Sequence, residues 1–273
     1  MLHDLPATAL VPLWARAVEA RSDEPLLVDD HAVEILERLG FDASVFDTMN
    51  VMARETTVAG TIVRTAQIDA KVRTIVGEHP GTRVVTLGCG LEARSRRLDD
   101  GATTWLDVDL PPIIELRERM LAAGERQRTM AASMFDDKVL AELAAPCEHP
   151  PVVVWEGVLL YFTPEEVYRL LVRLAQAVPR ATLVFDVVGT ALCEQHHPGV
   201  LAIGQDLPVA WGIDDHAVLG RLHPALHYVE FESAYDRFSR RWRVLSEMLP
   251  MLRERVGQGI VTMKIGRPHR TEP

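Results

Sequence analysis

Short β-branched runs alternate with helical stretches in the middle of the chain, and this alternation constrains the fold more than any other feature. The runs are RVVTLG (83–88), TTWLDVDL (103–110), PVVVWEG (151–157) and ATLVFDVVG (181–189). Helical stretches at 111–126 and 163–178 separate some of them, and the second opens with the capping box Thr163-Pro-Glu-Glu166. Nearly continuous apolar strands between helices are typical of a parallel sheet covered on both faces. The sequence therefore predicts an α/β fold with a doubly wound, mostly parallel sheet.

The 273 residues are predicted to form one domain with four parts. Residues 1–80 show helical periodicity, at 8–37 and 51–76, and form a helical cap. Residues 81–190 form the cofactor-binding core. Residues 190–216 have no clear period and follow a strand, which is typical of a lid or substrate loop. Residues 217–273 are predicted to form strands at 225–234 and 257–268 and a helix at 241–255.

Composition and charge exclude several classes of partner. The chain has 29 Lys and Arg against 39 Asp and Glu, a net charge of -10, which opposes attraction to nucleic acids and anionic membranes. Its three cysteines have the spacing of neither a disulfide framework nor a metal site. No signal peptide or membrane-spanning run is recognised. We expect a cytoplasmic protein without a metal, and the sequence does not predict its oligomeric state.

A glycine turn follows the first of these runs. Gly88 and Gly90 separate the run from a helical stretch, and Asp107 and Asp109 lie 19 and 21 positions after Gly88. Glycines allow a ligand to approach the backbone, and acids at this distance bind ribose hydroxyl groups. The spacing alone is consistent with NAD and with S-adenosylmethionine. A dinucleotide-binding unit usually opens its domain, whereas about 80 residues precede this turn, so the context favours S-adenosylmethionine.

Several motifs in order carry a family resemblance from about residue 8 to 190. The segments LGCGLEARSRRL (87–98), WLDVDLPPIIELRERML (105–121) and VVVWEGVLLYFTPEEVYRLL (152–171) resemble the leucine carboxyl methyltransferase-like family. The segment at 9–36 is similar to the entry helices of its bacterial branch, which includes polyketide carboxyl O-methyltransferases of the tetracenomycin type. The resemblance implies a Rossmann-like class I methyltransferase that uses S-adenosylmethionine to methylate a small-molecule carboxylate.

The resemblance also implies roles for individual residues. Gly88, with Gly90 in the same turn, would lie under the methionyl part of the cofactor. Asp109 would accept hydrogen bonds from the ribose hydroxyls, with Asp107 as the second choice. Glu156 would lie near the methionyl ammonium group. From the residues alone, Asp109 and Glu156 have an alternative role, because acids just after strands often bind local backbone N–H groups.

The methionyl carboxylate and the adenine have further implied partners. Arg64 matches the family's carboxylate-binding arginine, and Arg16 is a candidate helper, although a solvated position on a helix is the alternative for Arg64. The family usually has an Asp-Leu pair beside the adenine, and this chain has Ser133 and Met134 there. The adenine edge would be held either by backbone with Ser133 or by Asp136.

Methyl transfer requires alignment and exclusion of water more than reactive side chains. A carboxylate acceptor is ionised at neutral pH, whereas a phenol needs a base. The sequence offers no obvious base, so a small-molecule carboxylic acid, such as a polyketide, is the favoured acceptor and a phenol the alternative. Tyr161 is predicted to orient the acceptor oxygen, with Arg64 as a second candidate. A hydroxyl-directed methyltransferase, an NAD-dependent oxidoreductase and a non-catalytic cofactor-binding protein are the alternative functions.

Two other groups of residues receive structural interpretations. Arg94, Arg96 and Arg97 are predicted to form a solvated helix face. His196 and His197 lie in the predicted lid without an identifiable partner, so neither is assigned as a base.

Overall fold

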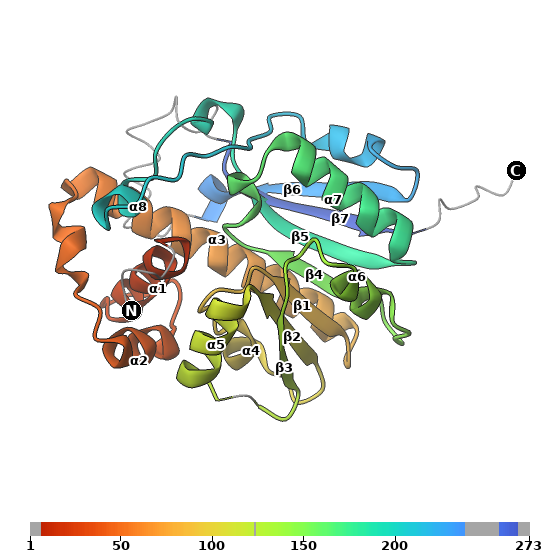
Figure 1. Ribbon diagram of the computed structural model, residues 1–273, viewed down its shortest axis with the longest axis horizontal. Coiled ribbons are helices and arrows are strands. Elements are labelled where there is room, and N and C mark those ends of the chain that lie inside the picture. The colour runs from red at the N-terminus through yellow and green to blue at the C-terminus, as the bar shows by residue number, and fades with distance from the viewer. Residues whose placement is uncertain (1–6, 123, 238–256, 267–273) are drawn as a thin grey trace, which may run out of the picture.

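The fold is built on one seven-stranded sheet, in a computed structural model that describes residues 7–122, 124–237 and 257–266. Its strands are β1 (Arg83–Leu87), β2 (Thr104–Asp109), β3 (Gln127–Ala131), β4 (Val152–Trp155), β5 (Ala181–Val187), β6 (Leu226–Ser233) and β7 (Gly259–Ile265). Their order is β3-β2-β1-β4-β5-β7-β6 (Figure 1). Strands β1 to β5 pair in parallel, and β7 pairs antiparallel with both β5 and β6.

Helices cover both faces of the sheet, which explains why its central strands are continuously apolar. In β1, Val84 packs into the core beneath α3 and α4, whereas Val85 packs into the core beneath α6 and α7. Successive strand residues point to opposite faces, so a strand buried on both faces has apolar residues throughout. The covering helices are α3 (Val51–Glu78), α4 (Arg94–Leu98), α5 (Pro111–Met120), α6 (Asp137–Ala144) and α7 (Pro164–Ala177).

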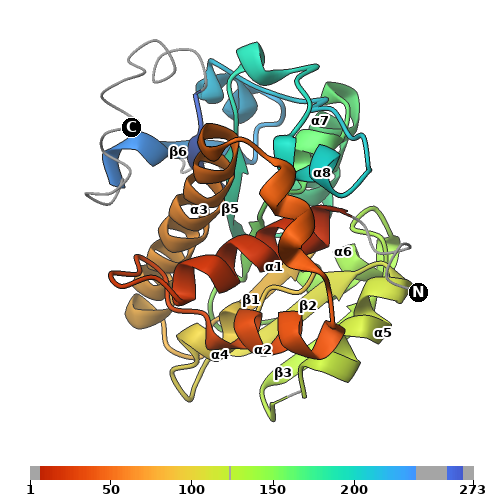
Figure 2. The same ribbon diagram turned by 90° about the vertical axis from the view of Figure 1, so that its left-hand side faces the viewer.

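Three further helices lie together at one side of the sheet (Figures 1 and 2). They are α1 (Ala7–Ala20), α2 (Asp30–Leu39) and α8 (Pro198–Ala202). The side chain of Asp29 caps α2 by accepting a hydrogen bond from Ala32 N at 3.1 Å, and Gly40 ends the helix with a φ of 60°. α1, α2 and α3 share a second hydrophobic core that includes Trp14 and Phe46. This core attaches the N-terminal helices to the sheet-covering helix α3.

The predicted fold class is confirmed, and strands occupy each of the four β-branched runs. Strand β3 was not among the expected strands, because its sequence QRTMA is polar and lies at the half-exposed edge of the sheet. The strands expected at 225–234 and 257–268 are β6 and β7, and the helix expected at 241–255 lies outside the described residues. No helix in the described ranges is both long enough and apolar enough to span a membrane.

The segment predicted as a lid contains short helices without a continuous period. It includes η3 (Thr190–Leu192), α8 and an isolated bridge between His196 and Pro208. The packing of α8 against α1 and α3 places this segment beside the N-terminal helices. The predicted cap and lid are therefore neighbours in space.

Candidate active site

A cavity of about 350 Å³ opens at the carboxyl ends of β1, β2 and β4, a size typical of a small-molecule site. The order of the strands reverses between β1 and β4, and ligands of open α/β sheets bind at such a point. The first residues of α1 form the wall opposite the strand ends. The nine residues assigned to the cofactor or acceptor line this cavity, whereas the two alternatives, Asp107 and Asp136, do not; the nine are Arg16, Arg64, Gly88, Gly90, Asp109, Ser133, Met134, Glu156 and Tyr161.

The glycine turn brings backbone close to the cavity at two positions. Gly88 has a φ of 73°, and a Cβ atom there would lie 2.7 Å from Val158 Cγ2. Gly90 has a φ of 52°, and its N–H donates to Asp109 Oδ2 at 2.7 Å. Both residues are in the left-handed region that glycine adopts without strain. The turn therefore leaves space that a larger residue would fill, and it fixes the carboxylate of Asp109.

Asp109 and Asp107 have separate roles although they are two residues apart. Among the described residues, Asp109 accepts hydrogen bonds from backbone alone, from Gly90 N and from Leu110 N, both at 2.7 Å, and it lines the cavity. Burial raises the pKa of Asp109, against the lowering effect of these hydrogen bonds. Asp107 does not line the cavity, and its Oδ2 accepts a hydrogen bond from Arg117 Nη2 at 2.6 Å. Asp109 is therefore the acid available to a ligand.

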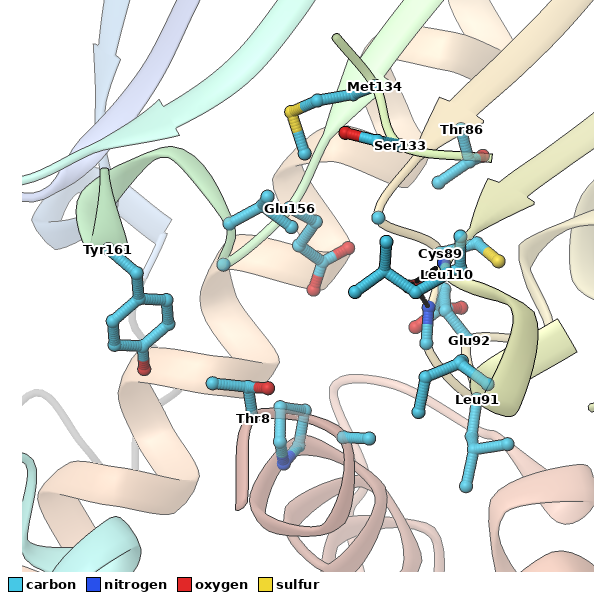
Figure 3. A pocket seen from close by; sticks show the side chains of 18 of the residues that line it. Thr8, Thr86, Cys89, Leu91, Glu92, Leu110, Ser133, Met134, Glu156 and Tyr161 are labelled. Carbon is cyan, nitrogen blue, oxygen red and sulfur yellow. Dashed lines mark hydrogen bonds between the residues drawn. The ribbon is translucent and has the colours of Figure 1, made fainter. Parts of the chain in front are cut away.

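Glu156 lies in the middle of the cavity wall, between Tyr161 and the glycine turn (Figure 3). Its Oε1 accepts a hydrogen bond from Thr65 Oγ1 at 2.5 Å, and its Oε2 accepts one from Arg94 Nη2. Burial is the largest influence on the pKa of Glu156 and would raise it, but the charges of Arg94 and Arg64 and the hydrogen bond from Thr65 together outweigh it, so the pKa lies below its ordinary value. Glu156 is therefore a buried anion, fixed by side chains and not by local backbone.

Arg64 approaches the same cavity from α3 with longer contacts. Its Nε lies 3.4 Å from Glu156 Oε1, and its Nη1 lies 3.5 Å from Asp186 Oδ2. Its guanidinium group packs against Gly157, where a Cβ atom would lie 2.9 Å from Nη2. Burial lowers the pKa of Arg64, but Asp186 and Glu156 more than offset this effect. Arg64 is therefore a buried cation beside the cavity and not a solvated one.

A buried network of ion pairs lies behind the cavity. Arg97 contacts Asp29 at 2.8 Å, Asp69 at 2.9 Å and Glu92 at 2.5 Å. Arg16 contacts Asp29 and Glu92, both at 2.9 Å, which closes a ring of four residues. These contacts join α1, the cap of α2, α3, the glycine turn and α4. Together with the longer contacts of Arg64, the network comprises Arg16, Arg64, Arg94, Arg97, Asp29, Asp69, Glu92, Glu156 and Asp186.

The prediction that Arg94 and Arg97 are solvated is wrong. Their side chains are 2% and 9% exposed, because α4 packs its first turn against acids of α3 and the glycine turn. Only Arg96 of the three faces solvent. Charged side chains are rarely buried unless they are paired, and each of these two contacts at least two carboxylates.

The opposite end of the cavity has an apolar wall and a serine. Ser133 and Met134 line it above the strand ends (Figure 3), and Leu110 and Ile113 lie nearby in the wall. Asp136 does not line the cavity, and its Oδ2 accepts a hydrogen bond from Ser133 N at 3.1 Å. Of the two predicted ways to hold an adenine, only the one through Ser133 and backbone has its groups at the cavity.

Tyr161 lies across the cavity from the glycine turn (Figure 3). Burial raises its pKa, as does Asp186, against the lowering effect of Arg64, so its hydroxyl remains a hydrogen-bond donor at neutral pH. His196 is exposed and binds Asp206. His197 caps α8, where its Nδ1 accepts a hydrogen bond from Gly199 N at 3.2 Å. Burial and, secondarily, Arg64 lower the pKa of His197 to about 4.

Sequence reasoning missed Thr65, Glu92, Arg94 and Asp69 as parts of the site. Thr65 binds Glu156 across 91 positions of sequence, and Arg94 binds it across 62. No local pattern contains such a pair. Only Glu92 carried a usable signal, because it lies inside the glycine turn that the sequence analysis assigned to the cofactor.

Known proteins are similar to this chain in fold and in sequence. A methyltransferase from Mesorhizobium loti, described as S-adenosylmethionine dependent, superposes with a TM-score of 0.51 over 71% of this chain and 96% of its own, at 17% identity. Tetracenomycin polyketide synthesis O-methyltransferase TcmP of Streptomyces glaucescens is 31% identical over 232 residues, which are 84% of this chain and 83% of that protein. The S-adenosyl-L-methionine-dependent methyltransferase dpfgK of Gibberella zeae is 28% identical over 61% of this chain and 59% of its own.

The fold and these relatives define the chain as a methyltransferase that uses S-adenosylmethionine. Its residues 9–175 match the leucine carboxyl methyltransferase family, and the chain belongs to that family. The predicted cofactor and enzyme class are confirmed, and the alternatives of an NAD-dependent oxidoreductase and a non-catalytic protein are set aside. The roles of the individual site residues stay predictions.

Proposed function

We propose that this protein methylates the carboxylate oxygen of a small, largely apolar acid, with S-adenosylmethionine as the methyl donor. The observation that carries the proposal is a cavity with ionised groups at the strand ends, apolar walls and no histidine among its described lining residues. The polyketide O-methyltransferase TcmP is similar over most of this chain, so aromatic polyketide acids are the first acceptors to test.

The groups around the cavity suit the parts of S-adenosylmethionine. The carboxylate of Asp109 has lone pairs left for ribose hydroxyls, because each oxygen accepts one backbone N–H. Glu156 supplies an anion for the methionyl ammonium group, and Arg64 a cation for its carboxylate. Arg16 serves better as a support, since its guanidinium already contacts Asp29, Glu92 and the Leu91 carbonyl.

The adenine has an apolar slot with one polar edge. Leu110, Ile113 and Met134 offer apolar surface, and the Ser133 hydroxyl replaces the family's carboxylate. Ser133 Oγ accepts a hydrogen bond from Phe135 N at 3.3 Å, which leaves its O–H to donate. We propose that this hydroxyl, and not Asp136, binds a ring nitrogen of the adenine, because Asp136 does not line the cavity.

The chemistry needs alignment, not a reactive side chain. Bound S-adenosylmethionine would supply a methyl group that is displaced in line from its sulfonium, so the acceptor's O–C bond forms as the C–S bond breaks, giving an ester and S-adenosylhomocysteine. Tyr161 donates its O–H to the acceptor oxygen and sets the direction of approach. The apolar residues Ala9 and Pro12 of α1 exclude water from the acceptor carboxylate and the sulfonium, whose opposite charges are both lost when the methyl group is transferred.

The carboxylate acceptor is favoured over a phenol by the state of His197. Its Nδ1 accepts the Gly199 N–H, so the proton of the neutral ring lies on Nε2. The ring therefore has no free basic nitrogen to remove a phenol proton, and its pKa of about 4 keeps it neutral. A carboxylate needs no such base, because its own pKa is about 4.

Paired assays test this function. Titration calorimetry with S-adenosylmethionine, S-adenosylhomocysteine and NAD should show binding of the two adenosyl ligands only. Methyl transfer from labelled S-adenosylmethionine should then be followed across matched pairs of aromatic acids and phenols. With an acid, the maximal rate should be constant between about pH 6 and 9. Transfer to phenols alone, rising with pH, would instead support the hydroxyl-directed alternative.

Tyr161→Phe should lower turnover more than it lowers cofactor affinity. The substitution removes one hydrogen bond to a charged oxygen, worth about 1.5 kcal/mol, so kcat should fall by roughly tenfold. The dissociation constant for S-adenosylhomocysteine should not change. Tyr168→Phe is the matched control, because Tyr168 is absent from the cavity lining. Lost cofactor binding with full turnover at saturation would contradict the assigned role.

A further inference from the structure

We infer that Arg94 is a positioning residue for the cofactor's ammonium group, because it holds the Glu156 carboxylate in place as an anion at the cavity wall. The inference rests on the proposed contact between Glu156 and that ammonium group. Arg94 does not line the cavity, so it would act only through Glu156.

The geometry makes Arg94 a bridge between two carboxylates. Its Nε donates to Asp69 Oδ1 at 2.7 Å, and its Nη2 donates to Glu156 Oε2. Asp69 is itself held by Arg97 at 2.9 Å, so the guanidinium is fixed from behind by the ion-pair network. A planar guanidinium can bind two acids along different edges, whereas a lysine ammonium has one charged end.

The charges around Glu156 explain why this bridge matters. Arg94 faces it from α4, while Arg64 and the Thr65 hydroxyl face it from α3. Glu92 of the glycine turn and Asp186 of β5 are negative groups in the same region, and Glu92 raises the pKa of Glu156. The Arg64 contact is long, at 3.4 Å.

Loss of the Arg94 charge should therefore raise the pKa of Glu156 towards the pH range in which the protein is assayed. Burial is the largest influence on its pKa and raises it, and Arg94 is the largest influence that lowers it. Once protonated, this carboxyl group would no longer attract an ammonium group. Ligand affinity would then depend on pH, falling by about tenfold per pH unit below the new pKa.

The test compares two ligands across pH. S-adenosylhomocysteine carries the ammonium group, and 5′-methylthioadenosine lacks it while keeping adenine and ribose. Dissociation constants are measured from about pH 5.5 to 8.5 for wild type, Arg94→Gln and Arg94→Lys. Arg96→Gln is the matched control, since Arg96 is the exposed arginine of the same helix. The ligand's own amino group titrates in the same way in every experiment. Its effect therefore cancels when the dissociation constant of each variant is divided by that of wild type at the same pH.

Arg94→Gln should lose affinity for S-adenosylhomocysteine progressively towards acid pH while its affinity for 5′-methylthioadenosine follows wild type. Equal losses for both ligands, or a loss that is the same at every pH, would overturn the inference and leave Arg94 a purely structural residue. Failure of the wild type to bind S-adenosylhomocysteine would overturn the proposed function instead. If Arg94→Gln does not fold, Arg94→Lys provides the test. Its affinity for S-adenosylhomocysteine should show a smaller loss towards acid pH, and a pH profile identical to that of wild type would contradict the inference.

Discussion

Asp109→Ala is expected to weaken S-adenosylmethionine binding by at least about 100-fold without unfolding the protein. Each hydrogen bond from a ribose hydroxyl to an ionised carboxylate contributes about 1.5–3 kcal/mol, and the substitution removes two. The fold should tolerate the change, because Asp109 holds only the N–H groups of Gly90 and Leu110, beside an open cavity. Titration calorimetry measures the effect directly.

Asp107→Asn is the control for this experiment. Asp107 is buried against Arg117 and Gln127 and does not line the cavity, so its loss should lower the melting temperature and leave cofactor affinity unchanged. The comparison of the two variants would thus separate an effect on cofactor binding from an effect on the stability of the fold. A dissociation constant for Asp109→Ala within threefold of wild type, or a large loss of affinity in Asp107→Asn, would reverse our assignment of the ribose acid.

Arg97→Met is expected to destabilise the fold by about 3–5 kcal/mol, which corresponds to a melting temperature roughly 10 °C lower. Arg97 contacts three buried carboxylates, those of Asp29, Asp69 and Glu92, and methionine would leave each with one cation fewer. Arg96→Met makes the same substitution at the exposed neighbouring position and should melt like wild type. A calorimetric melt of both variants tests the expectation.

The same variant should also become more sensitive to acid. Burial raises the pKa of Glu92, but Arg16 and Arg97 outweigh this and hold it well below its ordinary value. A carboxyl group with a lowered pKa stabilises the folded state above its unfolded value of about 4.3, and this stability is lost as the pH falls. Without Arg97 the lowering is smaller, so acid unfolding should begin at a higher pH. Unchanged acid and thermal midpoints would mean that the network adds no net stability.

The sequence predicted the sheet and the members of the cavity because both follow from local patterns. Continuous apolar runs between helices require burial on both faces, and strand-end residues such as Gly88, Asp109 and Glu156 meet wherever parallel strands end together. Strand β3 was missed for the same reason, since a half-exposed edge strand has no continuous apolar run. Arg64 and Arg16 depended on the family resemblance, because nothing local separates them from solvated arginines.

The partners of the site residues were beyond prediction from local patterns. Three arginines in five residues are typical of a solvated face, and acids from other elements, among them Asp69 on α3, 25 positions from Arg94, reverse that interpretation. The choice between Asp107 and Asp109 also required coordinates, since it depends on which acid Arg117 already occupies. The burial of the arginines and the different surroundings of Asp107 and Asp109 thus both depend on charge pairs between separate elements of the fold.

The division of the cavity between strand ends and α1 has an evolutionary consequence. The groups we assign to the cofactor belong mainly to the sheet and its turns, whereas Thr8, Ala9 and Pro12 of α1 form the opposite wall. Side chains at the start of a helix can be exchanged without disturbing strand pairing. Related enzymes can therefore diversify their acceptors by drift in the first helix while their use of the methyl donor stays constant, and the same few positions are where a protein engineer would begin.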